Sequence, residues 1–183
     1  MFRIADYFCS ISSLTRRTFS TITVAGCLLG MPLGFAGEDA LTSPVHFQNY
    51  QEIFSHIADA NELFNDPEMI LQLSNECRVE YPPDAQKDGQ TRAVMALNLM
   101  DNGVNILRGA SGNGVYYVIQ STATGLDLVG ILEGNSWKHQ VINDRDAFVT
   151  TWHMSAEEYV ETTYEWNGSV FAKTNSRTVK ETE

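Results

Sequence analysis

The histidines and carboxylates of this 183-residue sequence lack the spacing that catalytic and metal sites require. The four histidines are His46, His56, His139 and His153. No two of them have metal-ligand spacing, and none belongs to a His-Glu-x-x-His pattern. Asp144 and Asp146 flank Arg145 in a stretch that we expect to be an exposed turn, whereas acid–base catalysis needs two carboxylates held apart in a pocket. We therefore predict no metal site and no catalytic carboxylate.

The remaining chemical motifs are better explained as structural features. Asn98-Leu99-Met100-Asp101-Asn102-Gly103 resembles an eroded calcium loop of the Asp-x-Asn-x-Asp-Gly kind, but Met100 occupies a ligand position, so we expect a hairpin. Ser111-Gly112-Asn113-Gly114 precedes no helix pattern and does not predict a phosphate-binding loop. Cys77 follows helical apolar spacing, which indicates a buried side chain; a disulfide-linked dimer is the alternative for a lone thiol. We predict no cofactor and no enzyme activity.

Aromatic side chains are the candidates for binding. Tyr116-Tyr117 and Trp152-His153 are neighbouring pairs in predicted strands, where successive side chains point to opposite faces. One member of each pair should therefore point away from the core. An exposed aromatic side chain on a curved sheet is suited to contact a protein or a glycan, so Tyr116, Tyr117, Trp152 and His153 are the predicted binding residues.

The charge of the chain restricts its partners. The formal net charge is −11, from 12 basic and 23 acidic residues. Residues 1–36 contain three arginines and one aspartate, so the rest carries 9 basic and 22 acidic residues, a net charge of 9 − 22 = −13. Such a polyanion is repelled by nucleic acids and by anionic lipid surfaces, which excludes nucleic-acid binding, whereas a basic protein is attracted.

The first 36 residues have the three parts of an export signal peptide. A positive stretch ends at Arg16-Arg17, an uncharged apolar run covers 19–35, and Gly34-Phe35-Ala36 fits a signal peptidase site. Thr15-Arg16-Arg17-Thr18-Phe19 also resembles the twin-arginine motif, so both the twin-arginine and the general secretory route stay open. We expect a periplasmic or secreted protein with no membrane span after residue 36.

A lipid anchor is the alternative form of export. Val24-Ala25-Gly26-Cys27 resembles a lipobox, in which Cys27 would become the lipidated first residue. The apolar run continues through Leu33, whereas a lipoprotein normally turns polar directly after its cysteine. Cleavage after Ala36 is therefore the first prediction, and a lipid anchor on Cys27 is the second. An uncleaved anchor is the third, with an apolar run of marginal length for a membrane helix.

The pattern after residue 36 predicts a single α+β domain over 37–183. Ser43-Pro44 and Asp66-Pro67 are helix-start signals, each followed by apolar residues at spacings of three and four, so we expect two helices within 44–77. A polar linker follows over 81–90, then a β region over 91–175 and a short polar tail. Asn102-Gly103, Asn113-Gly114 and Asn167-Gly168 are predicted hairpin turns.

The expected architecture has the two N-terminal helices covering a curved antiparallel β-meander or partial barrel of about eight strands. These strands are expected at 93–100, 104–108, 115–120, 126–132, 137–142, 148–154, 159–166 and 169–173. In the seventh, Val160, Thr162, Tyr164 and Trp166 should share the buried face.

The C-terminal hairpin carries a family resemblance. Tyr164-Glu165-Trp166-Asn167-Gly168-Ser169-Val170-Phe171 resembles the terminal hairpin of small secreted bacterial β-rich domains, in which Tyr-x-Trp-Asn/Asp-Gly-x-x-Phe/Tyr closes a sheet. The resemblance covers 93–173. Ser111-Gly112-Asn113-Gly114-Val115-Tyr116 is similar to the Ser-Gly-x-x-Tyr loop of periplasmic lysozyme inhibitors, with one extra residue. The resemblance implies an exported β-sheet domain and no particular activity.

Three functions follow as hypotheses. The first is a periplasmic or secreted accessory protein that binds another macromolecule, in an inhibitor or immunity-like role, without catalysis. The second is an envelope hydrolase that uses dispersed carboxylates and therefore needs a pocket with a carboxylate pair. The third is a small-ligand carrier with an apolar cavity between helices and sheet.

Overall fold

The computed structural model of the chain describes residues 41–60, 71–72, 75–82, 91–97, 100–101, 104–105, 107–108 and 111–180. The predicted signal peptide, the twin-arginine motif and Cys27 lie outside these residues, as does most of the predicted linker. Export and lipidation therefore stay predictions. Within the described part of the chain, no helix combines the length and the apolar character needed to span a bilayer.

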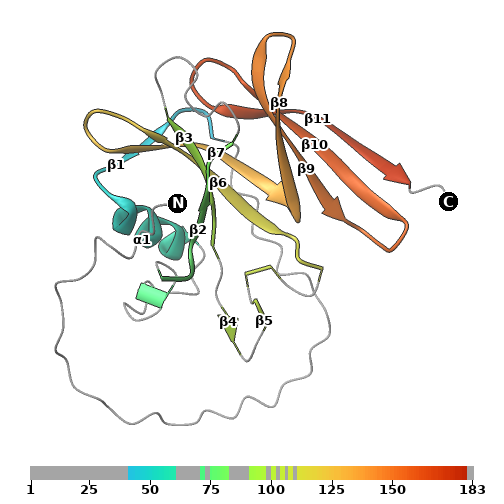
Figure 1. The fold of residues 1–183 in the computed structure, drawn as a ribbon, viewed down its shortest axis with the longest axis horizontal. Coiled ribbons are helices and arrows are strands. Elements are labelled where there is room, and N and C mark those ends of the chain that lie inside the picture. Colours follow the sequence, from blue (N-terminus) through green and yellow to red (C-terminus); the bar gives the residue numbers. More distant parts are fainter. Residues whose placement is uncertain are drawn as a thin grey trace. The chain divides into compact units, whose positions relative to one another are not determined.

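The fold consists mainly of two antiparallel sheets (Figure 1). The first has the strand order β1-β7-β6-β3-β2, and the second has the order β11-β10-β9-β8. The first contains β1 (Val45–Phe47), β2 (Arg78–Glu80), β3 (Arg92–Ala96), β6 (Gly114–Ser121) and β7 (Leu126–Gly134). The second contains β8 (Ser136–Ile142), β9 (Arg145–His153), β10 (Glu158–Trp166) and β11 (Phe171–Lys180). A small ribbon pairs β4 (Met100–Asp101) with β5 (Val104–Asn105), and one helix, α1 (Tyr50–Ala60), precedes β2.

The expectation of two N-terminal helices over one curved sheet is wrong. Besides α1, the described residues have only short helical stretches at 71–72 and 75–76, and short strands form on either side of α1. Ser43-Pro44 does not begin a helix, because Val45, His46 and Phe47 extend along β7 instead. The helix begins later, where the Asn49 side chain accepts a hydrogen bond from the Glu52 N–H at 3.1 Å. Beyond it, β2 begins at Arg78, directly after Cys77.

Two of the three predicted Asn-Gly hairpins are confirmed. Asp101 lies opposite Val104 in the ribbon of β4 and β5, as a hairpin at 102–103 requires, although those two residues lie outside the described ones. At the β10–β11 turn, Asn167 Oδ1 accepts hydrogen bonds from the N–H groups of Ser169 and Val170, both at 2.9 Å. The hairpin predicted at Asn113-Gly114 is wrong, because β6 begins at Gly114.

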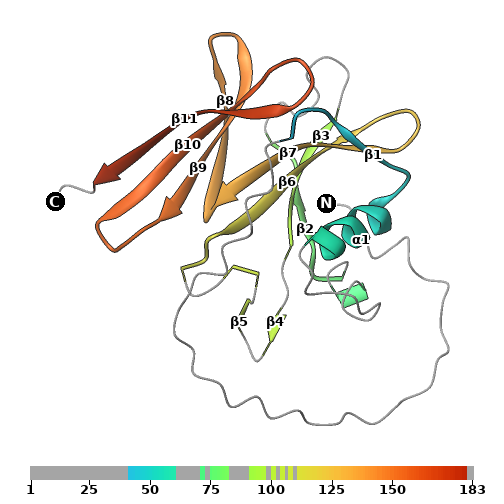
Figure 2. The ribbon, with the colours of Figure 1, turned by 180° about the vertical axis from the view of Figure 1, so that it is seen from behind.

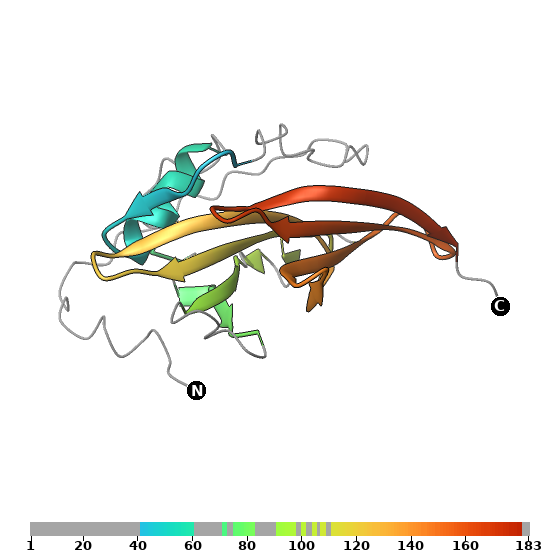
Figure 3. The ribbon, with the colours of Figure 1, turned by 90° about the horizontal axis from the view of Figure 1, so that it is seen from above.

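The first sheet is covered on both faces, and this explains how so short a chain builds two apolar clusters. α1 packs on one face, and the second sheet packs on the other (Figures 2 and 3). The α1 cluster contains Phe47, Ile53, Phe54, Ile57, Met95, Leu97, Tyr117, Ile119 and Leu128. The cluster between the sheets contains Val94, Tyr116, Val118, Val129, Leu132, Phe148, Tyr164 and Phe171. Consecutive residues of β3 and β6 alternate between the clusters, as strand geometry requires.

The strand alternation predicted for β10 is confirmed at its centre. Thr162 and Tyr164 are buried, whereas the neighbouring Thr163 is half-buried. β11 continues to Lys180, beyond the predicted end at residue 173, because its residues pair with β10 as far as Glu158. The region predicted to be partly a polar tail is therefore mostly an edge strand with exposed side chains.

Candidate functional site

The two sheets meet at a sharp corner around Asn135. β7 ends at Gly134 and β8 begins at Ser136, so one residue carries the chain from the first sheet to the second. The Asn135 N–H donates to the Thr151 carbonyl at 2.7 Å, and the Thr151 hydroxyl donates to Asn135 Oδ1 at 2.7 Å. A Cβ on Gly134 would lie 2.7 Å from the Thr151 carbonyl oxygen, so this close crossing of strands requires glycine.

The start of β6 is attached to the same corner. The Tyr116 hydroxyl donates to the Asn135 carbonyl at 2.7 Å. Asn113 is buried, and its amide pairs with the backbone of His153: Nδ2 donates to the His153 carbonyl and Oδ1 accepts from its N–H, both at 2.9 Å. These bonds hold the end of β9, and with it Trp152, His153 and Met154, which we call the rim.

The rim exposes apolar surface on a fixed backbone. Met154 is 63 % exposed, His153 is exposed, and Trp152 is half-buried. On the side of β10, Trp152 lies opposite Val160 and His153 lies opposite Tyr159. The rim is therefore an aromatic and aliphatic edge supported by a strand on one side and by Asn113 on the other.

The expectation that one of Tyr116 and Tyr117 points to solvent is wrong. The two side chains do face opposite sides of β6, but Tyr116 is 6 % exposed and Tyr117 is 3 % exposed, because the sheet is covered on both faces. Tyr117 packs in the α1 cluster, away from the rim, whereas Tyr116 reaches the corner through its hydroxyl. Of the four predicted binding residues, Trp152 and His153 are therefore the two that present accessible surface.

A buried charged network between the sheets was missed by the sequence analysis. Arg92 Nη1 donates to Asp146 Oδ2 at 2.9 Å, and Arg92 Nε donates to Gln120 Oε1 at 3.0 Å. The guanidinium carbon lies 4.2 Å from the ring centroid of Trp166, and His139 Nε2 lies 3.7 Å from Asp146 Oδ1. The expectation that Asp146 lies in an exposed turn is wrong, since this side chain is 9 % exposed. The sequence contained one indication of this burial. Asp146 is two residues before the buried Phe148, so in a strand the two side chains lie on the same face.

The hydrolase hypothesis requires a pair of carboxylates placed in a pocket. Among the described residues, Asp146 is the one buried carboxylate, and it is paired with Arg92. A catalytic carboxylate must be able to reach a substrate, whereas the Asp146 side chain is 9 % exposed and bonded to Arg92. The described residues also contain no group of three or more potential metal ligands.

One exposed histidine–carboxylate pair lies elsewhere, between β1 and β7. His46 Nδ1 is 2.7 Å from Asp127 Oδ1, and His46 Nε2 is 3.4 Å from the side-chain amide nitrogen, Nε2, of Gln48. A nucleophile would have to occupy the place beside Nε2 for this pair to act as a catalytic base. Gln48 stands there instead, so the pair serves to join β1 to β7.

The thiol of Cys77 is kept in its protonated form. Burial raises its pKa from 9.0 to about 12, and the side chain is half-buried beside the α1 cluster. The thiolate is the nucleophilic form of cysteine, so Cys77 is a packing residue at neutral pH. Burial, and to a smaller extent the neighbouring Tyr81 and Cys77, raises the pKa of Tyr50 to about 12.

Comparison of the chain with protein families, curated proteins and solved structures found no match.

Proposed function

We propose that this is an exported accessory protein, periplasmic or secreted, that binds another protein in an inhibitor or immunity-like role and does no chemistry. The observation that carries the proposal is the rim, where exposed Met154 adjoins Trp152 and His153 at the end of a sheet. Exposed apolar and aromatic groups that lie together are the usual centres of protein interfaces.

The rim is suited to binding because its backbone is ordered before a partner arrives. Asn113 fixes His153 through two hydrogen bonds, and β10 pairs with the other edge of β9. A binding surface that is already ordered loses little conformational entropy on association, so more of the contact energy remains as affinity.

The charge of the chain supports a basic partner. The segment after residue 36 carries 9 basic and 22 acidic residues. Glu157 is exposed in the turn that follows the rim, whereas Glu158, at the start of β10, is half-buried and paired with Lys180. Such a field accelerates association with a basic protein and weakens as ionic strength rises.

Site-specific photo-crosslinking in the producing cell tests the proposal. p-Benzoylphenylalanine at position 154 should give one discrete cross-linked protein of basic composition, in a yield that falls with added salt. The same group at position 141 is the matched control, because Val141 is 51 % exposed but lies near the β8–β9 turn. Equal cross-linking from both positions, or none from position 154, would contradict the proposal.

A quantitative test follows once that partner is purified. Trp152→Ala combined with Met154→Ala should weaken binding by about tenfold or more, with an unchanged free energy of unfolding to within about 1 kcal/mol. The variant Val141→Ala should bind like the wild type. Wild-type affinity in the rim variant would exclude the rim as the contact surface.

A further inference from the structure

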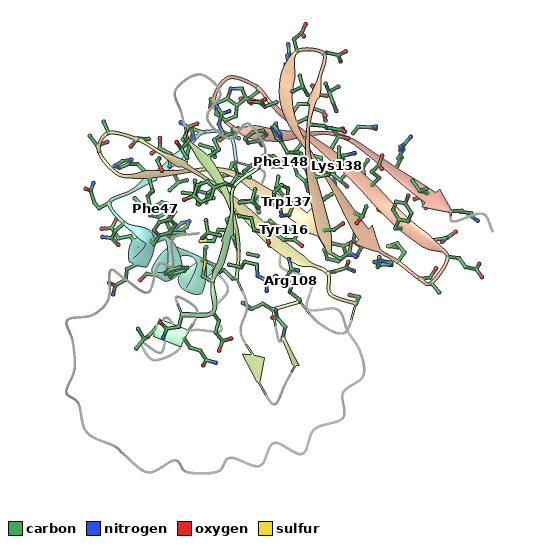
Figure 4. The ribbon with its side chains drawn as sticks, in the orientation of Figure 1. Phe47, Arg108, Tyr116, Trp137, Lys138 and Phe148 are labelled. Atoms are coloured by element: carbon green, nitrogen blue, oxygen red, sulfur yellow. The ribbon has the colours of Figure 1, made fainter. Side chains whose placement is uncertain are left out.

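The Arg108 side chain packs against β6, near the corner at Asn135 (Figure 4). Its guanidinium carbon lies 4.4 Å from the centroid of the Tyr116 ring, and Tyr116 is itself held by Asn135. Gly114 lies against the stem of the arginine: a Cβ there would be 2.9 Å from Arg108 Cγ and 3.2 Å from Nε. The Arg108 side chain is half-buried, and the two residues that it contacts, Gly114 and Tyr116, both belong to β6.

One edge of the Arg108 guanidinium has unused hydrogen-bonding capacity. Nε and Nη2 are both shielded from solvent, and neither has a hydrogen-bond partner among the residues that the structure describes. The guanidinium carbon lies over the Tyr116 ring, and beside this contact Nε and Nη2 stay without a hydrogen-bond partner from the described residues. Buried charged donors without an acceptor are unfavourable, so an acceptor at this edge stabilises the site.

Arg92, which is buried, differs from the half-buried Arg108 in its hydrogen-bond partners. Arg92 donates from Nε to Gln120 and from Nη1 to Asp146, so its buried charge is neutralised within the chain. Arg108 has no ion pair within the described part of the chain, although acidic residues outnumber basic ones by 23 to 12 in the whole sequence. The missing counter-charge at Arg108 is therefore not explained by a shortage of carboxylates.

We propose that the Nε–Nη2 edge of Arg108 binds a carboxylate. The two N–H groups lie side by side in one plane, and this geometry matches the two oxygens of a carboxylate in a bidentate pair. The carboxylate belongs either to a free small acid or to an acidic side chain of a bound protein. The site is independent of the rim, since neither Arg108 nor Gly114 is part of it.

The test follows the Nε–Hε NMR signal of Arg108 while sodium acetate is added to the ¹⁵N-labelled protein, with sodium chloride at equal ionic strength as the reference. The signal is assigned by its loss in Arg108→Lys. A saturable shift with acetate and none with chloride is expected. A blocked peptide with one glutamate, titrated in parallel, distinguishes the sources: binding of acetate indicates a free acid, and binding of the peptide alone indicates a protein side chain.

Three variants make the result specific. Arg108→Lys keeps the charge but loses the planar edge, and should weaken binding of the probe by about tenfold or more. Gly114→Ala keeps the arginine but displaces its stem, and should weaken binding similarly. Arg145→Lys changes an exposed arginine and should have no effect. In the two variants that alter the site, binding is followed by tryptophan fluorescence or calorimetry, and near-UV circular dichroism confirms the fold.

Three results would overturn the proposal. The first is an Arg108 signal that responds equally to acetate, the peptide and chloride. The second is a folded Arg108→Lys variant that binds the probe as tightly as the wild type. Tighter binding of inorganic phosphate than of either carboxylate probe would also overturn it, because it would show that a tetrahedral anion is preferred.

Discussion

Asn113 and His153 are joined by two hydrogen bonds although 40 residues separate them in the sequence. β8 pairs with β9 only as far as Thr151, opposite Ser136. Beyond that point the side chain of Asn113 takes the place of a neighbouring strand, because it supplies one donor and one acceptor to the backbone of His153. The side-chain amide of Asn113 thus continues the hydrogen bonding along this edge of β9 as far as the rim.

The variant Asn113→Ala tests this relationship. It leaves the N–H and the carbonyl of His153 without their partner, and a lost hydrogen bond of this kind lowers the free energy of unfolding by about 1–3 kcal/mol. Urea unfolding measures the change. Asn175→Ala, at an exposed position of β11, should change the stability by less than about 0.5 kcal/mol. Equal stability of the two variants would show that the Asn113 bonds contribute nothing.

Removing one partner of the buried Arg92–Asp146 pair should lower the free energy of unfolding strongly, whereas replacing both partners by apolar residues should lower it much less. Asp146→Ala leaves the guanidinium of Arg92 buried without its carboxylate, which should lower the free energy of unfolding by about 3–5 kcal/mol. Combining Arg92→Met with Asp146→Leu removes both charges and should recover most of that loss. Both changes are measured by urea unfolding.

An exposed ion pair provides the matched control for that experiment. Arg177 Nη2 lies 2.6 Å from Glu161 Oε1, with the arginine side chain 65 % exposed. Glu161→Gln should cost less than about 1 kcal/mol, because solvent screens an exposed pair. A double variant at 92 and 146 that is no more stable than Asp146→Ala would argue that the network acts through geometry and not through charge compensation.

The long strands were predictable from local pattern, whereas their division into two sheets was not. The turn of Asn167-Gly168 between alternating segments was enough to predict the hairpin of β10 and β11. Gly134-Asn135-Ser136 reads in the sequence as an ordinary turn between neighbouring strands of one sheet. The cause of the corner is a close approach of Gly134 to Thr151, which only the folded chain shows. A meander that changes sheet through one residue reads in sequence like a meander in one sheet.

For the predicted binding residues, the sequence showed on which face of a strand each side chain lies, but not whether that face is covered. Alternation placed Tyr116 and Tyr117 on opposite faces, and that much is correct. It could not show that both faces are covered, because α1 and the second sheet come from distant segments. The partner of Asp146 is likewise 54 residues away, so the sequence around Asp146 contains no sign of it.

Cys77 should react slowly with alkylating reagents in the folded protein. Its pKa of about 12 leaves a very small thiolate fraction at pH 8, so iodoacetamide should modify it on the order of a thousandfold more slowly than in urea. Mass spectrometry of the Cys77 peptide measures the rate. A thiol introduced by Met154→Cys, at an exposed position, should react at the rate of a free cysteine. Similar rates at both positions would contradict a buried, protonated Cys77.

The stability of the protein should fall as the pH rises from about 9 to 12. Cys77 and Tyr50 have pKa values of about 12 in the folded protein, against ordinary values of 9.0 and 10.0. In this window the unfolded chain releases protons that the folded protein retains, so raising the pH favours unfolding. The stabilisation is complete below pH 9 and is lost as the pH approaches 12. Each group should contribute a slope of up to about 1.4 kcal/mol per pH unit.

Tyr50→Phe isolates one part of that slope. The variant keeps the aromatic ring beside Phe54 but has no hydroxyl to titrate, so its stability between pH 10 and 11 should fall less steeply than that of the wild type. The wild-type protein, measured in parallel under the same conditions, is the reference. Urea unfolding at intervals of half a pH unit measures both. If the slope of Tyr50→Phe equals that of the wild type, the phenol of Tyr50 titrates alike in the folded and unfolded chains, and burial at this position does not oppose its ionisation.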